Sequence, residues 1–585
     1  MSSSEPPSPA APPGTALPEA TVRALVAGCG IGVLLAAGNV YTGLKIGFID
    51  GGGITAALVG FAMFSRSRAR RRYGSLENNI TQTAAASAAV MMLGLGLAGP
   101  IPALGLMNMT PPGWAIAIWG LAAGILGIAA AVVLRRKLIV EDALPFPTGR
   151  ATAEVIETIQ TVRGAAVRRA WLLVGAGVLA MVVTWFRMGT PKLIPEVTPI
   201  AGTIAGVAIT SLTLGMNWSP LLLSVGAMIG PRGGASVLLG GSLGWAVLSP
   251  LVLRAGIIHE ASFGELSKWL VWPALGLLVA GSFVPLLLDF GALRRAFRDL
   301  GALARRIRGG RPTTDQPGAS VSPRLLIWMC LASVVVLVIL GRTMFGFSPT
   351  TTLIGVVLAL VLTNVSARAT GETDVGPVGA MGMFTQAVFA GAGVLTSLMN
   401  GGVAMGTSTQ TCQLMYAYRA GEQLGASPRA QVVAQILGAV VGATVVMPVY
   451  FLLVKIYGIG TQALPASGAQ SWKAMAEMLV GGASSLPARW LLATVVGAGA
   501  GAALAVGGRT RVGRFLPSPA AMGMAMLIPA NYSVTIFVGA VCVVAARRIR
   551  PGLNESHVMT VAAGGIAGES LMGVLVALLS AAGVL

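Results

Sequence analysis

Long apolar runs separated by short polar stretches repeat along almost the whole chain. About sixteen runs are long enough, or nearly so, to cross a bilayer, which takes about 20 mostly apolar residues. They cover residues 22–42, 46–64, 79–98, 114–134, 170–188, 198–216, 235–253, 269–289, 325–341, 350–365, 377–397, 402–418, 430–454, 488–506, 516–546 and 557–584. This pattern predicts an all-α polytopic membrane protein.

Two apolar stretches have lengths that do not fit one straight span. The stretch 219–231 is too short to cross and has a proline near each end, and 516–546 is long for one span with Pro529 inside it. Freed backbone groups at membrane depth are tolerated where protein or a water-filled cavity satisfies them. We therefore expect some helices to be broken or re-entrant.

The hydrophilic stretches suggest a division into two halves. Residues 1–18, rich in Ser, Pro and Ala, are expected to form a disordered cytoplasmic tail. An N-terminal transmembrane half over 19–290 and a C-terminal half over 324–585 flank a basic cytoplasmic linker, 291–323. Because basic residues cluster in the loops on the cytoplasmic side of membrane proteins, the N-terminus is expected to be cytoplasmic.

Short motifs recur between the proposed halves in the same order. At separations of 328, 323 and 328 residues, the pairs are Thr81-Gln82-Thr83 with Thr409-Gln410-Thr411, Ala151-x-Ala153-Glu154 with Ala474-x-Ala476-Glu477, and Gly240-x-Ser242-Leu243 with Gly568-x-Ser570-Leu571. Three matches at nearly one spacing favour an internal duplication. Duplicated halves with broken helices at the substrate site are a recurring plan of secondary transporters.

Composition narrows the function classes. Only 10% of residues are charged and 55% are hydrophobic, whereas a soluble domain carries about 25% charged residues. The net charge of +20 is explained by basic loops, so nucleic acid is not an expected partner. The four cysteines are scattered without a C-x-x-C pair, which gives no sign of a disulfide framework or a metal site.

No sequence signature of an enzyme or of an ATP-driven pump is present. The chain lacks a G-x-x-x-x-G-K-[ST] motif, an H-E-x-x-H motif, and neighbouring intramembrane aspartates. We therefore expect no enzyme activity and no cofactor, and a carrier driven by an ion gradient remains.

The first intramembrane polar cluster contains Asn39, Tyr41, Lys45 and Asp50, followed by three glycines. Ionisable residues in a span often mark a pathway or site. Lys45 and Asp50 are too far round a regular helix to meet, but an unwound segment would let both face a cavity. The alternative is a loop between two helices with both charges solvated.

A second cluster includes Asn79 and Gln82, and its counterpart in the other half includes Gln410, Gln413 and Tyr416. Carboxamides both donate and accept hydrogen bonds, which suits peptide-like amides and carboxylates. Hydrogen bonds that hold helices together are the alternative explanation.

The third candidate is Glu569, a lone carboxylate in an apolar run. Burial disfavours its charged form, which makes it a candidate for proton coupling together with Asp50. The alternative is a structural ion pair with an arginine or lysine elsewhere in the chain.

Several motifs together resemble the oligopeptide transporter (OPT) family in its bacterial branch, close to the yellow stripe-like metal-chelate carriers. They run from about residue 22 to 572 and are N-x-Y-x-G-L-K-x-G from Asn39, E-N-N-x-x-Q-T from Glu77, L-P-F-P-x-G-x-A-x-A from Leu144, S-P from Ser219 with Gly226, L-G-A-S-P-R-x-Q from Leu424, and P-S-P-x-x-M from Pro517. The resemblance implies about sixteen helices in two related halves and proton-coupled import of small peptides or peptide-like solutes.

In this interpretation a central cavity is lined by substrate-binding residues, and protons pass through Glu569 or Asp50. The substrate-binding residues are Asn39, Tyr41, Lys45, Asn79, Gln82, Gln410, Gln413 and Tyr416. Where the peptide-transporting branch has a Lys-Ile-Pro-Pro-Arg type motif, this chain reads Ala426-Ser427-Pro428-Arg429, which keeps metal-chelate or siderophore transport open as an alternative. A channel or a membrane-embedded enzyme is the further alternative.

The balance of basic residues bears on location. Arginine outnumbers lysine 34 to 6, which fits a GC-rich bacterium and hence its inner membrane. The expected partners are the lipid bilayer, protons and a small-molecule or peptide substrate, with no indication of the oligomeric state.

Overall fold

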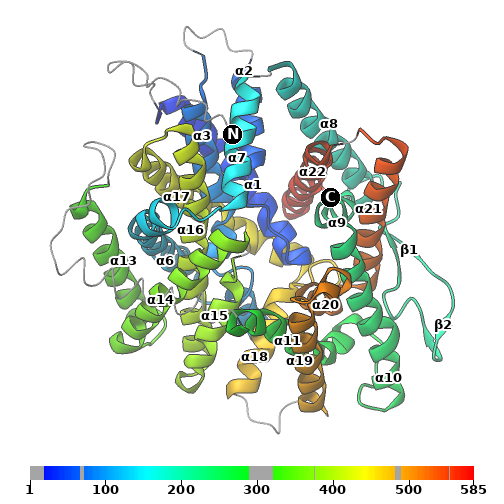
Figure 1. The fold of residues 1–585 in the computed structure, drawn as a ribbon. Coiled ribbons are helices and arrows are strands. Elements are labelled where there is room, and N and C mark those ends of the chain that lie inside the picture. The colour runs from blue at the N-terminus through cyan, green and yellow to red at the C-terminus, as the bar shows by residue number, and fades with distance from the viewer. Residues whose placement is uncertain are drawn as a thin grey trace.

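The structure is a computed structural model that describes residues 19–65, 72–161, 163–288, 321–374, 376–480, 489–552 and 554–585. The predicted tail 1–18, most of the linker 291–323 and most of the basic run 66–72 lie outside the described residues. The described chain is a bundle of helices with two small strand pairs at one edge (Figure 1). The predicted all-α polytopic class is confirmed.

The elements before the linker begin with α1 and end with α11. They are α1 (Val22–Ile46), α2 (Gly53–Ser65), α3 (Ser75–Ala89), α4 (Met91–Gly94), α5 (Pro100–Leu106), α6 (Gly113–Arg135), η1 (Arg136–Glu141), α7 (Pro147–Thr161), α8 (Arg163–Met188), β1 (Val197–Pro199), β2 (Thr203–Ile204), β3 (Val207–Ala208), β4 (Gly215–Asn217), α9 (Pro220–Gly241), η2 (Ser242–Leu248), α10 (Ser249–Arg254) and α11 (Phe263–Leu288).

The elements after the linker are helical throughout the described residues. They are α13 (Pro323–Thr343), α14 (Pro349–Thr373), α15 (Val378–Val388), η3 (Ala390–Ala392), α16 (Val394–Leu424), α17 (Pro428–Tyr457), α18 (Ser467–Val480), α19 (Trp490–Gly507), η5 (Arg511–Phe515), α20 (Pro519–Met526), α21 (Ala530–Ile549) and α22 (Glu555–Ala581).

Eleven helices of the described chain are long and apolar enough to cross a membrane. Most of the other predicted runs fall on shorter or more polar helices. The run 46–64 becomes the 13-residue α2, and 402–418 lies inside α16, whose many buried polar residues set it apart from the apolar spans. About sixteen apolar segments therefore correspond to fewer full-length spans.

The predicted span 198–216 is wrong. This stretch forms two antiparallel strand pairs, β1 with β4 and β2 with β3. Gly202 and Gly206 have positive φ values of 133° and 83°, so the backbone turns where a helix would have to continue. The run also carries several threonines, whose branched side chains fit an extended chain.

The two stretches with unusual lengths are broken helices, as predicted. α9 runs from Pro220, breaks at Gly230 (φ 71°) before Pro231, and continues through η2 and α10 to Arg254. In the second stretch, the eight-residue α20 is separated from α21 by Leu527–Pro529. Proline removes a backbone donor and clashes with the preceding turn, which accounts for a break at each place.

Glycines let the broken helices approach closely. A Cβ at Gly226 would lie 1.9 Å from the Ile536 oxygen, and one at Gly234 would lie 2.7 Å from the Ala540 Cβ. Both positions thus pack against the same turn of α21, although eight residues of straight helix would separate them by about 12 Å. The chain therefore bends sharply at Gly230.

Packing partners are exchanged between the two parts of the chain. α3 packs against α17 while α16 packs against α6, and α8 packs against α22 while α19 packs against α11 (Figure 1). Such an exchange is what two related repeats produce if α3 matches α16, α6 matches α17, α8 matches α19 and α11 matches α22. The division at the linker stays a prediction, which these pairs support.

The third motif pair does not follow this order. Gly240 lies at the end of α9, whereas Gly568 lies in α22, the counterpart of α11 in the exchanged packing. The β segment between α8 and α9 is longer than the connection between α19 and α20. The spacing between matching elements of the two halves is therefore not constant beyond α8.

Replacement of Gly226 tests the close packing at the break. Gly226→Ala should destabilise the protein by about 1–3 kcal/mol, since the added methyl group meets the backbone of α21. Thermal unfolding in detergent measures the loss. Gly175→Ala on α8 is the control, because a Cβ there meets nothing within 4 Å. Equal melting temperatures for the two variants would contradict the packing argument.

Candidate functional site

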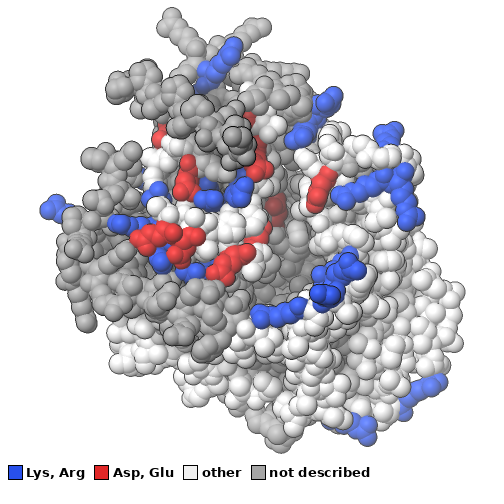
Figure 2. Space-filling model, viewed as in Figure 1, with Lys and Arg blue, Asp and Glu red and all other residues white. Residues whose placement is uncertain are grey.

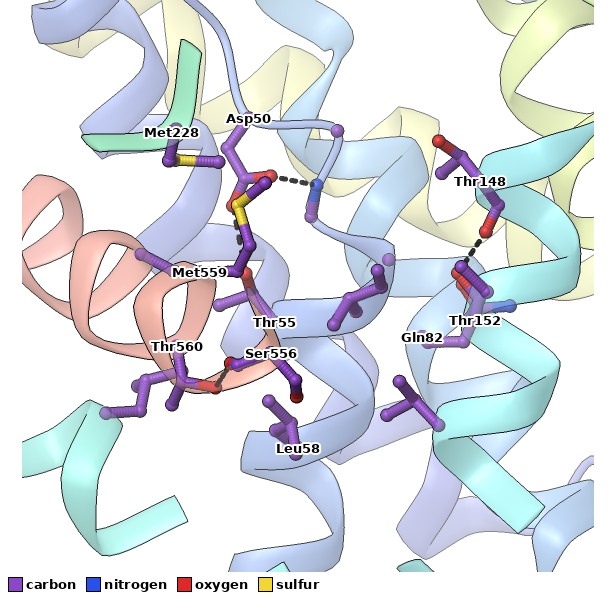
Figure 3. Close-up of a pocket in the computed structure, with 18 of the residues that line it drawn as sticks. Asp50, Thr55, Leu58, Gln82, Thr148, Thr152, Met228, Ser556, Met559 and Thr560 are labelled. Carbon is purple, nitrogen blue, oxygen red and sulfur yellow. Dashed lines mark hydrogen bonds between the residues drawn. The ribbon is translucent and has the colours of Figure 1, made fainter. Parts of the chain in front are cut away.

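A cavity of about 610 Å³ lies where α2, α7, α8, α16 and α22 approach one another. Its wall also includes the glycine loop, residues 47–53 (GFIDGGG), which joins α1 to α2. The face in Figure 2 is hollowed near its centre, with acidic and basic side chains around the hollow. Figure 3 shows Thr148, Thr152 and Gln82 on one side of the cavity, and Asp50 and Thr55 on the other side next to Met559 and Thr560 of α22.

The glycine loop is held in place by Asn39 and Asp50. The Asn39 amide donates to the Asp50 and Ala89 carbonyl oxygens at 2.8 and 2.9 Å, and its oxygen accepts from the Asp50 backbone N–H at 3.2 Å. The Asp50 carboxylate accepts from the Gly52 N–H and the Thr55 hydroxyl, both at 3.0 Å. Asp50 therefore faces the cavity, while Asn39 is buried behind it and positions it.

Three of the predicted amide and phenol side chains lie at the cavity wall. They are Gln82 of α3 and Gln413 and Tyr416 of α16. Gln82 donates to the Asn79 side-chain oxygen at 2.9 Å, so Asn79 supports Gln82 from behind. The Tyr416 hydroxyl donates to the Asp374 carbonyl oxygen at 3.0 Å.

Gln410 lies away from the cavity. Its amide donates to the Ser87 carbonyl oxygen at 3.2 Å, and its oxygen accepts from Gln435 at 2.6 Å. These bonds join α16 to α3 and α17. For Gln410 the geometry matches the alternative explanation, hydrogen bonding between helices.

Lys45, Arg187 and Glu569 form a buried ion cluster. One Glu569 oxygen, Oε1, lies 3.1 Å from Lys45 Nζ and 2.7 Å from an Arg187 guanidinium nitrogen. The other, Oε2, accepts from the Ser219 hydroxyl at 2.6 Å and from the Leu221 backbone N–H at 2.9 Å. All four partners donate, so the carboxylate is held as an anion. The three side chains are 2%, 0% and 0% exposed.

Aromatic and amide groups complete the surroundings of the ion cluster. Lys45 Nζ donates to the Tyr41 hydroxyl at 2.9 Å and lies 5.6 Å from the Tyr532 ring centre. Arg187 donates to the Asn217 side-chain oxygen at 3.1 Å. Tyr41 is thus a partner of Lys45, and neither residue lines the cavity described above.

The cavity and the ion cluster lie at different depths along the same helix. Thr560 and Ala563 of α22 line the cavity, and Glu569 follows Ala563 by six residues, about 9 Å along a helix. The cavity is at the end of the bundle where α22 begins, close to the basic run that ends α21. The ion cluster is therefore further inside the bundle.

The family model for the OPT oligopeptide transporter protein matches residues 19–580. The chain belongs to this family. A Haemophilus influenzae protein assigned as an oligopeptide transporter is 25% identical over 93% of this chain and 93% of its own length. A Saccharomyces cerevisiae protein with the same assignment is 26% identical over 80% of this chain and 82% of its own.

Relatives from plants are named for a different solute. A metal-nicotianamine transporter of Arabidopsis thaliana is 23% identical over 94% of this chain and 92% of its own length. The suggested family and a transporter rather than an enzyme are thereby confirmed. The two kinds of relative are thus named for different solutes.

Some site residues of this OPT transporter were not predicted from the sequence. Arg187 lies near the end of the predicted run 170–188 and is not among the predicted site residues, although it is fully buried against Glu569. The signal that identifies it is Glu569 itself, because a buried carboxylate needs a cation. Arg169 and Glu555, which line the cavity, lie at predicted segment edges and gave no such signal.

Removal of the Asn39 side chain tests its role behind the glycine loop. Asn39→Ala should lower stability by about 1–3 kcal/mol, because buried backbone groups of Asp50 and Ala89 lose their partner. Thermal unfolding measures the change. Asn400→Ala is the matched control, since this equally buried amide donates to the Thr396 carbonyl oxygen within its own helix. The same loss in both variants would contradict a special role for Asn39.

Proposed function

We propose that this chain is a secondary active transporter that imports small peptides or peptide-like solutes together with protons. The observation that supports it best is the chemistry of the cavity wall. Amide and hydroxyl groups, which both donate and accept hydrogen bonds, lie among apolar side chains together with two acidic side chains and one basic side chain. Such a wall suits a solute with peptide bonds and charges of both signs.

In this proposal the charged groups of the cavity wall bind different ends of the solute. Asp50 and Glu555 face the cavity as acids, and Arg169 faces it as a base. The solute ammonium group would be bound near Asp50 and a carboxylate near Arg169. Gln82, Gln413 and Tyr416 would contact the peptide backbone between them.

Proton coupling is assigned to Glu569, with Asp50 as the second candidate. Glu569 is shielded from water and bound by groups of three other elements, α1, α8 and α9. Protonation would remove its attraction to both cations at once, so a change of charge there would be felt by several helices. Asp50 has the simpler position on the cavity wall.

The proposed setting is a bacterial inner membrane with a cytoplasmic N-terminus. Basic clusters at 163–169 and 547–550 flank the end of the bundle where the cavity lies. By the positive-inside rule this end faces the cytoplasm. The described conformation would then be the one from which solute reaches the cytoplasm.

Uptake into proteoliposomes tests the solute class. With an inward proton gradient, labelled trialanine should accumulate above its equilibrium level, and Gln413→Ala should reduce uptake at least tenfold by weakening solute binding. A binding loss of about 1.4 kcal/mol corresponds to that factor. No uptake of di- to tetrapeptides by the wild type would refute peptide transport.

Exchange assays test the coupling assignment. Glu569→Gln should abolish accumulation driven by the gradient, while counterflow exchange continues, because the amide cannot carry the proton. Glu265→Gln is the control, an exposed carboxylate on α11 that is paired with Lys268 at the surface. Undiminished accumulation by Glu569→Gln would transfer the role to Asp50, for which Asp50→Asn is the corresponding variant.

Metal-chelate transport is the second candidate. Relatives named as metal-nicotianamine transporters match 94% of the chain, and the thioethers of Met228 and Met559 line the cavity. Competition decides between the two. Excess iron–nicotianamine should leave trialanine uptake unchanged if peptides are the solute, and should itself be taken up if chelates are.

A further inference from the structure

We infer that the ion cluster is a carboxylate-binding site that Glu569 fills as a tethered ligand and that a carboxylate of the solute fills during transport. The part concerning the solute rests on the proposed function. The part concerning the binding site stands on the geometry of Lys45, Arg187 and the start of α9 alone.

The site has the donors that carboxylate recognition requires. Two cations contact one carboxylate oxygen, and a hydroxyl and a backbone N–H contact the other. The N–H belongs to Leu221 in the first turn of the 22-residue α9, where the helix dipole favours negative charge. Charge-assisted bonds of this kind are about twice as strong as neutral ones.

The charges in the site do not balance. Lys45 and Arg187 bring two positive charges to the single carboxylate of Glu569, and all three side chains are buried. The other groups that face them are Tyr41, Tyr457 and Tyr532, which are phenols, and Asn217 and Ser219, which are neutral. A buried excess of positive charge is costly unless an anion compensates it.

Glu196 is a further acid whose charge acts on the site, and it does not belong to the buried set. It lies in the exposed segment before β1, where it acts on Arg187 and Tyr41 only through its field. The site therefore keeps capacity for a second negative charge from outside.

Two polar atoms at the site have no partner. The Arg187 Nε and the Thr184 hydroxyl, one turn earlier on the same face of α8, are buried without a hydrogen bond. Both residues are at most 2% exposed. Buried donors of this kind are uncommon in folded proteins and indicate a ligand that is not held in the described conformation.

Glu569 can leave the site without taking the cations with it. It is on α22, whereas Lys45 is on α1 and Arg187 is on α8. α22 contacts α8 through backbone at Gly564 and Gly568, where a Cβ would lie 2.3 and 2.1 Å from α8 carbonyl oxygens. At these two positions the contact is made by backbone and not by interlocking side chains, and the proposal requires a shift of α22 along α8 that withdraws the carboxylate.

Replacement of Glu569 by a solute carboxylate also explains how proton and solute transport are coupled. If Glu569 takes up a proton, it no longer neutralises Lys45 and Arg187, and a solute carboxylate that replaces it restores the same net charge. Each transport step then requires one proton bound to Glu569 and one solute carboxylate bound to Lys45 and Arg187. No bond other than the O–H bond of Glu569 is made or broken.

Chemical rescue tests the site without a known solute. Glu569→Ala removes the tethered carboxylate and leaves two buried cations, so its melting temperature should fall well below that of the wild type. Acetate at 100 mM should raise the melting temperature of this variant by several degrees, because a ligand that binds only the folded state stabilises it. Acetamide, a neutral analogue of similar shape, should have no such effect.

Two further variants make the rescue specific. Glu569→Ala combined with Arg187→Gln should lose the acetate effect, since one of the two cations is gone. Glu265→Ala, which removes an exposed carboxylate on α11, should respond to acetate no more than the wild type does. Equal responses to acetate and acetamide in Glu569→Ala would overturn the site; if that variant does not fold, the same comparison is made with Glu569→Gln.

Transport of matched solutes tests the part that concerns the solute. Wild-type proteoliposomes should prefer trialanine to trialanine amide at least tenfold, and Arg187→Gln should reduce this preference to below twofold. An unchanged preference would overturn the solute part, and rescue by acetate would then mark a site for free anions. Absence of uptake for both peptides in the wild type would refute the proposed function, while the rescue result still decides the site.

Discussion

The burial of three charged side chains away from water is the constraint on which the centre of this protein depends. Each charge would be costly alone, and Lys45 and Arg187 reach the carboxylate that they share only if α1, α8, the start of α9 and α22 meet at one point. The Tyr41 hydroxyl then accepts a hydrogen bond from Lys45, and the Asn217 side-chain oxygen accepts one from Arg187. Glycines between α8 and α22 allow the helices to come close enough for these contacts. Charge and close packing therefore specify the same arrangement.

Much of the fold could be predicted because apolar runs of membrane length carry a strong signal. The breaks at Gly230–Pro231 and before α21 were predictable as well, since prolines interrupt runs of the wrong length. The stretch 198–216 was not, because average apolarity does not distinguish an extended Thr- and Gly-rich segment from a helix. Periodicity and β-branched content are the features that separate them.

The sequence placed only three of the eight predicted substrate-binding residues, Gln82, Gln413 and Tyr416, at the cavity wall that the structure shows. Asp50 of the glycine loop and Gln82 of α3 lie at the cavity together with Gln413 and Tyr416 of α16, more than 300 residues later in the sequence. Gln410, three residues before Gln413, points to neighbouring helices instead, a difference that depends on the rotation of α16. Sequence patterns place a residue in a helix, and only the packing of the bundle decides which neighbour it faces. Arg187 shows the same limit, because its partner Glu569 is 382 residues away.

The separation of cavity and ion cluster connects this geometry to the behaviour of an OPT transporter. The cavity wall carries neutral amides and hydroxyls together with charged groups, whereas the deeper site offers two cations to one carboxylate. Positive charge is in excess at the deeper site and is shielded from water there. The electrostatic attraction of an anionic group is therefore stronger at the deeper site than in the cavity, which favours its movement inward. The elements that would have to move for this gain to be realised are α22, which carries Glu569, and the broken α9, which supplies Ser219 and Leu221. Both approach their neighbours closely at glycines, α22 against α8 at Gly564 and Gly568 and α9 against α21 at Gly226, so close backbone packing and charge coincide in this part of the bundle.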